Sequence, residues 1–121
     1  MMNFRDMAKK ATTLSPLMQD KKSIKQGELI ERFPDGVTIT AFDYIHNKKG
    51  EKYPVFTIKE DETIFVNGGT VINSIFTEFV DAFKGDVDAA SRELSREGGL
   101  TCKFYWGENK GGDKTVLVTV L

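Results

Sequence analysis

The spacing of apolar residues changes several times along the chain, and each change predicts a new element. Apolar side chains recur every three or four positions over residues 3–14, which predicts a short N-terminal helix that ends before Pro16. A turn at residues 34–36 combines proline, aspartate and glycine. After it, β-branched and aromatic residues fill residues 37–45, the composition of a strand. Residues 52–59 are the expected returning strand of a hairpin.

The second half of the chain is expected to contain a third strand, two helices and two further strands. Residues 63–66 form the short third strand. An amphipathic helix is predicted over residues 70–83, and a second helix over residues 86–97, with Asp86 as its N-cap. Residues 100–106 and 115–121 read as strands. The apolar face expected to be buried in the first helix consists of Val71, Ile72, Ile75, Phe76, Phe79, Val80 and Phe83.

This succession predicts a mainly-β fold with a helical insert, in the order β-β-β-α-(α)-β-β. That order is typical of the OB-fold, a small five-stranded Greek-key barrel. A β-rich sandwich and an α+β sheet with a helix across one face would share it. We expect an N-terminal helical arm over residues 1–26 and an OB-like domain over residues 27–121.

Composition narrows the class of protein. The chain has 121 residues, of which 40% are hydrophobic and 29% charged, which fits one globular domain. Its N-terminal residues lack the uninterrupted apolar run of a secretory signal, so the cytoplasm is the expected location, and no membrane partner is expected. One cysteine and one histidine exclude an internal disulfide framework and leave no ligand set for a zinc site. No cofactor is expected.

Neither residue is a good candidate for catalysis. His46 falls in the predicted hairpin turn, without the oriented partner that a catalytic base requires. Cys102 shares one strand face with Leu100, Phe104 and Trp106, every second residue of the predicted strand, which is the pattern of a buried and inert thiol. The sequence therefore predicts a protein that is not an enzyme.

Lysines and aromatic residues gather where an OB-fold binds nucleic acid. Proteins that hold single strands combine lysines along the phosphate backbone with rings on which bases stack. In OB-folds the face of strands two and three, and the loops between strands one and two and between four and five, line the binding groove. The candidate binding residues are Tyr44, Lys48, Lys49, Lys52, Tyr53, Phe56, Lys103, Tyr105, Trp106, Lys110 and Lys114.

Two roles stay open for these rings. Aromatic residues are also common in barrel cores. Trp106, the last apolar residue before a glycine-rich loop, fits either a plug at the barrel end or a platform for a base.

Several short sequence features stand out over residues 27–121: FPDG, YPVF, a Gly-Gly-Leu strand, a lysine-glycine loop and a hydrophobic last strand. In this layout the chain resembles the small single-stranded-DNA-binding proteins of tailed phages and prophages of Gram-positive bacteria. The resemblance implies an OB-type fold that coats single-stranded DNA during phage replication or recombination, in the cytoplasm of the host cell. Further partners would be a second copy of the chain or replication and recombination proteins. The alternative from a different class is a phage protein-protein interaction module, an adaptor or an inhibitor of a host enzyme.

Overall fold

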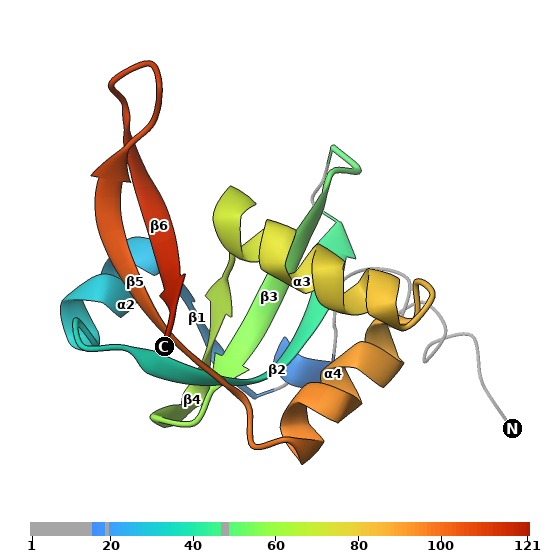
Figure 1. The fold of residues 1–121 in the computed structure, drawn as a ribbon. Coiled ribbons are helices and arrows are strands. Elements are labelled where there is room, and N and C mark those ends of the chain that lie inside the picture. The colour runs from blue at the N-terminus through green and yellow to red at the C-terminus, as the bar shows by residue number, and fades with distance from the viewer. Residues whose placement is uncertain (1–15, 19, 47–48) are drawn as a thin grey trace, which may run out of the picture.

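Six strands form a single curled sheet, a half-barrel with helices packed around it (Figure 1). The computed structural model describes residues 16–18, 20–46 and 49–121, so the predicted helix over residues 3–14 lies outside the described residues. The elements are η1 (Pro16–Met18), β1 (Lys22–Lys25), α2 (Gln26–Arg32), β2 (Val37–His46), β3 (Lys52–Ile58), β4 (Asp61–Asn67), α3 (Thr70–Ala82), α4 (Val87–Arg96), β5 (Leu100–Glu108) and β6 (Lys114–Val120). Among these described residues, no helix is long and apolar enough to cross a bilayer.

From β2 onward the elements follow the predicted succession, and the sheet order is β1-β4-β3-β2-β5-β6. Three consecutive antiparallel strands, β2 to β4, are joined to a fourth, β5, that returns beside β2 after two helices. This is a Greek-key arrangement. The expected five strands are wrong by one, because β1 adds a sixth by pairing in parallel with β4. β1 lies in the predicted N-terminal arm and buries Ile24 in the core.

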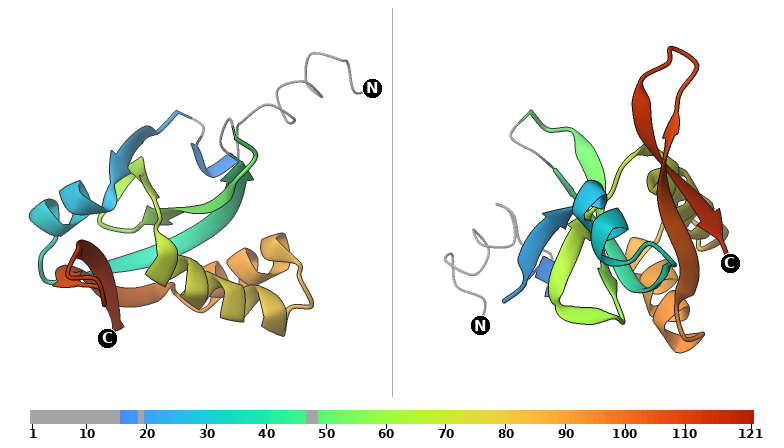
Figure 2. Two further views of the ribbon diagram at one scale, coloured as in Figure 1. Left: turned by 90° about the horizontal axis from the view of Figure 1, so that it is seen from above. Right: turned by 90° about the vertical axis from the view of Figure 1, so that its left-hand side faces the viewer.

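The sheet consists of two wings that share only a short ladder. β2 pairs with β5 through residues 37–39 alone, whereas β5 pairs with β6 from Cys102 to Glu108. Two helices bridge the wings: α2 contacts β4 and β5, and α3 contacts β3 and β6. The right-hand view of Figure 2 shows α2 between the β1–β4 side of the sheet and the β5–β6 hairpin. Helices therefore join the two wings where no strand pairing of the described residues does so.

Stacked phenylalanine rings fill the space between the wings and α3. Phe42 of β2 stacks on Phe76 of α3 with ring centroids 4.3 Å apart, and Phe56 of β3 stacks on Phe104 of β5 at 5.5 Å. Phe56 also meets Phe76 edge to face, at 5.9 Å. All four side chains are fully buried. The stack joins three strands and a helix into one core.

The apolar face of α3 is buried only in part. Ile72 and Phe76 are buried, and Val71, Ile75, Phe79 and Val80 are half-buried. Phe83 is 38% exposed, so its expected burial is wrong. The helix ends at Ala82, and Phe83 is its C-cap with non-helical backbone angles, which carries the ring off the buried stripe.

Two serines of α4 form hydrogen bonds with the backbone of β2, on the edge where β2 no longer pairs with β5. Beyond Ile39 no residue of β5 pairs with β2. The backbone N–H of Phe42 donates to the Ser91 hydroxyl at 3.0 Å, and the Ser95 hydroxyl donates to the carbonyl of Thr40. α4 thus covers an edge that would otherwise present bare backbone groups.

Replacing Phe76 by alanine is expected to lower the free energy of unfolding by about 3–5 kcal/mol, because the ring is fully buried between two others. Urea denaturation followed by circular dichroism measures the loss. Phe83→Ala is the matched control on the same helix, and its loss should be well under half as large. Equal losses for the two variants would contradict the described core.

Candidate nucleic-acid interface

Two β-hairpins project from the same side of the molecule, as Figure 1 and the right-hand view of Figure 2 show. One joins β2 to β3 and the other joins β5 to β6. They are the lysine-bearing loops expected to border a binding groove. Lys49 is exposed at the tip of the first hairpin, and Lys110 in the loop of the second. Lys48 lies outside the described residues.

The first hairpin carries a lysine over an aromatic ring. Tyr44 of β2 pairs with Pro54 of β3, so the two side chains point to the same face. Lys52 lies two positions before Pro54 on β3, and its side chain therefore points to that face too. The Lys52 ammonium lies 4.4 Å from the centre of the Tyr44 ring. Burial raises the pKa of the Tyr44 phenol, the nearby Asp81 carboxylate adds to that rise, and a hydrogen bond with Thr77 of α3 opposes it. Tyr44 is therefore held against α3, with its ring half-buried.

Tyr53 does not share this face. It pairs with Ile45 and thus points to the opposite side of the hairpin from Tyr44. Phe56 is fully buried in the phenylalanine stack, so it is a core residue and cannot serve as the expected platform for bases. The three aromatic candidates of this hairpin thus differ: Phe56 belongs to the core, Tyr44 is half-buried on the inner face, and Tyr53 points to the outer face.

The outer face of β3 and β4 is also occupied. Val55, Thr57 and Phe65 point away from the main core yet are buried. The short η1 segment contacts β2, β3 and β4. The expectation that the face of strands two and three is open to a ligand is wrong here, because these side chains are inaccessible.

The second hairpin alternates as predicted. Lys103 and Tyr105 are exposed on the outer face of β5, and Cys102 and Phe104 are buried on the inner face. The Thr119 hydroxyl of β6 donates a hydrogen bond to the Tyr105 hydroxyl at 3.2 Å, which holds the ring across the two strands. In the loop, the Asn109 side-chain oxygen accepts bonds from the backbone of Gly111 and Asp113. This turn presents Lys110 to solvent.

Trp106 lies on the inner face of the second hairpin but beyond the core. It is 44% exposed, because β5 and β6 continue past the phenylalanine stack as a two-stranded ribbon. The Lys114 ammonium lies 4.8 Å from the centre of the indole ring. Trp106 is therefore not a buried plug of the barrel end. Both projecting hairpins carry one lysine over one aromatic ring on their inner faces.

Trp106 lines an open groove of about 730 Å³ between the β1–α2 segment and the β5–β6 hairpin. Its other lining residues are Ser23, Ile24, Lys25, Gln26, Gly27, Glu28, Asn67 and Val116. Most of them come from residues 23–28, a segment that contains no predicted site residue. The apolar residues Ile24, Leu29, Ile30 and Phe33 are the sequence signal for ordered structure here, but they are too few and too close together to define a helix or strand period.

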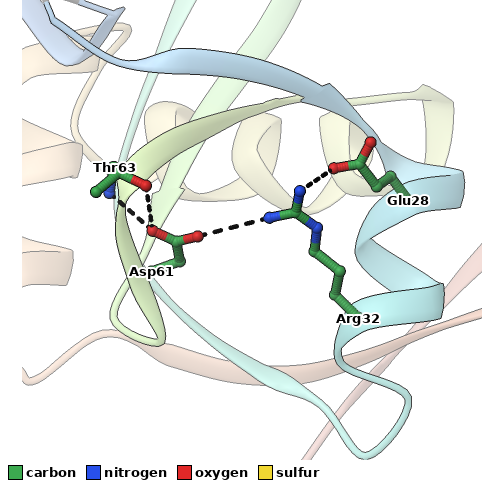
Figure 3. Close-up of polar contacts among 4 residues, drawn as sticks. All are labelled: Glu28, Arg32, Asp61 and Thr63. Atoms are coloured by element: carbon green, nitrogen blue, oxygen red, sulfur yellow. Dashed lines mark hydrogen bonds and ion pairs between the residues drawn. The ribbon is translucent and has the colours of Figure 1, made fainter.

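Polar contacts anchor the helix that forms one wall of this groove. Arg32, in the last turn of α2, contacts Glu28 at 2.6 Å and Asp61 of β4 at 3.6 Å (Figure 3). The hydroxyl and backbone N–H of Thr63 both donate to Asp61, at 2.6 and 2.9 Å. These two bonds, and more weakly the Arg32 guanidinium, lower the pKa of the Asp61 carboxyl. Leu29 completes the attachment by packing its side chain into the core.

The single thiol offers no reactive group to this surface. Cys102 is fully buried, and this burial, with a smaller contribution from the charge of Glu60, raises the pKa of the thiol to about 12. A protonated thiol is a poor nucleophile. His46 is exposed at the end of β2.

Comparisons with protein-family models, with curated proteins and with solved structures find no match to this chain.

The Cys102 thiol should make the stability of the fold depend on pH in the alkaline range. The unfolded chain releases this proton near the ordinary pKa of 9.0, whereas the folded chain holds it to about 12. The unfolded state therefore binds fewer protons, and stability falls as pH rises between these values. Urea denaturation of the protein and of Cys102→Ala over this range isolates the thiol. The difference in stability between them should be constant below pH ~8 and shrink above pH ~9. Parallel curves up to pH ~11 would contradict the burial of the thiol.

Proposed function

We propose that the protein binds single-stranded DNA, without catalysing a reaction, on the side where its two hairpins project. The observation that carries the proposal is the repeated arrangement on the inner faces of these hairpins. Each bears an ammonium group within 5 Å of the centre of an aromatic ring, 4.4 Å for Lys52 and Tyr44 and 4.8 Å for Lys114 and Trp106. Lysines beside partly exposed rings are what proteins use to hold single strands, the ammonium for phosphates and the ring for bases.

The topology supports the finer assignment to an OB-type barrel. The Greek-key order of β2 to β5, the helices inserted before β5 and the terminal β5–β6 hairpin correspond to the OB plan. On that plan the two projecting hairpins are the loops between strands one and two and between strands four and five, both of which line the ligand groove of OB-folds. The resemblance to phage proteins favours a role in phage replication or recombination.

Lysines lie on both sides of the groove beside the second hairpin. Lys103, Lys110 and Lys114 lie on or beside this hairpin, together with the carboxylates of Glu108 and Asp113, and Lys25 lies across the groove. We expect the phosphates of a bound strand to contact these lysines.

Binding of a fluorescent polythymidine oligonucleotide, measured by anisotropy at several salt concentrations, tests the proposal. Affinity should fall as salt rises, because phosphate contacts release counterions. Replacing Lys110 or Lys114 by glutamine should reduce the slope of log affinity against log salt by about 0.7 each, the value for one phosphate contact on a single strand. Lys59, exposed in the turn after β3 at the other end of that strand, is the matched control, and Lys59→Gln should leave the slope unchanged. Absence of binding at low salt, or an affinity independent of salt, would refute the proposal and favour a protein partner.

Tyr105 should contribute to binding from the outer face of the second hairpin. Tyr105 is 36% exposed and lies two positions after Lys103, on the same face of β5. Tyr105→Ala is expected to weaken binding by roughly 1–3 kcal/mol, the contribution of one stacked base. Tyr105→Phe keeps the ring, removes the hydroxyl that accepts from Thr119, and should retain most of the affinity. If Tyr105→Ala unfolds part of the protein and the remaining folded molecules bind with unchanged affinity, the ring stabilises the fold and does not contact DNA.

A further inference from the structure

Glycine residues lie beside the groove next to Trp106, at positions where a side chain would crowd its lining. Gly27 lies within α2, where glycine is a poorer helix former than alanine. It has no positive φ that would call for glycine. A Cβ atom at this position would lie 3.1 Å from Cζ2 of Trp106. Gly27 is therefore explained by the close approach of the indole ring.

Gly69 repeats the pattern on the other side of Gln26. Its φ is −114°, which any residue can adopt. A Cβ atom on Gly69 would lie 2.6 Å from Nε2 of Gln26. Trp106 and Gln26 both line the groove, Trp106 as a rigid ring against Gly27 and Gln26 as a flexible side chain beside Gly69. The groove is a shaped feature of the packing between α2, β4 and β5.

We propose that this groove receives one unpaired base of the bound strand, stacked on Trp106, an inference that rests on the proposed function. The volume of about 730 Å³ falls within the usual range for small-molecule sites. Its lining supplies one large π-surface and two amides, those of Gln26 and Asn67. Each amide both donates and accepts hydrogen bonds, so the edges of all four bases find partners.

Charge complementarity favours a nucleotide over an uncharged ligand. Lys25 lines the groove, and Lys114 lies over the indole ring. The one carboxylate of the lining, Glu28, is paired with Arg32 at 2.6 Å. When a base takes the face of the indole, the flexible Lys114 side chain moves from the ring to the adjacent phosphate. One cation–π contact is exchanged for one ion pair and one stacked base.

Trp106 is the only tryptophan in the chain, so its fluorescence reports on this groove alone. Titration with polythymidine should quench and shift the emission. The control ligand is an abasic deoxyribose-phosphate strand of equal length, which keeps the phosphates and lacks the bases. It should bind more weakly and leave the emission nearly unchanged.

Three variants complete the test. Trp106→Ala should weaken polythymidine binding by about fivefold to 150-fold, the equivalent of one stacked base. Gly27→Val should push the indole out of place, narrow the groove and weaken binding to a similar degree, with circular dichroism confirming that the fold is kept. Should Gly27→Val not fold, Gly27→Ala, which favours the helix, still presses its Cβ against the indole and should shift its emission. Phe83→Ala removes a similarly exposed ring outside the groove and should have no effect.

The outcomes separate the two proposals. Salt-dependent binding with an unchanged Trp106 emission, and with full affinity in Trp106→Ala and Gly27→Val, would overturn the base site and leave DNA binding intact. Equal quenching by the abasic strand would also overturn it, because phosphate contact alone would then account for the signal. Absence of any DNA binding at low salt would overturn both.

Discussion

Packing among four phenylalanine rings holds the two wings of the sheet together. β2 and β5 share a ladder of only residues 37–39, too short to fix the angle between the wings by backbone hydrogen bonds. The contacts of Phe42 with Phe76 and of Phe56 with Phe104 set that angle instead, by joining strands of both wings through α3. The positions of both projecting hairpins follow from it. So does the groove, since one of its walls belongs to each wing.

Much of the fold was predictable because its longer elements have clear signals. Residues 37–46 have the β-branched and aromatic composition of a strand, although a bulge between Ile39 and Ala41 interrupts the alternation of its buried side chains. Ile72 and Phe76 lie one helical turn apart on a wide apolar face. The strand β1 and the helix α2 were not predictable in this way. β1 has four residues with one buried side chain, and its parallel pairing depends on β4, about forty residues further along. α2 has seven residues, fewer than two full turns beyond its cap, so its pattern is lost among the charges around it.

The candidate site shows where residue types alone are insufficient. The two projecting lysine-bearing hairpins follow from composition, but the placement of single rings depends on register. Tyr44 pairs with Pro54 and not with Tyr53, and this single step puts the two tyrosines on opposite faces. Phe56 is indistinguishable by type from a stacking residue, yet it pairs with Phe42 and belongs to the core. The groove beside Trp106 depends on Gly27, whose role appears only when α2 lies against β5.

The serines of α4 have a consequence for synthesis on the ribosome. Ser91 is 49 residues behind its partner Phe42, and Ser95 is 55 residues behind Thr40. At ~5–20 residues per second, these partners leave the ribosome on the order of 2–10 s after β2 does. In the later part of that interval, once β4 has also emerged, the β2–β3–β4 meander is complete but this edge of β2 is bare, and a bare edge invites pairing with another nascent chain. This stretch of the β2 edge is thus covered late in synthesis, and by two hydroxyl groups rather than by a strand.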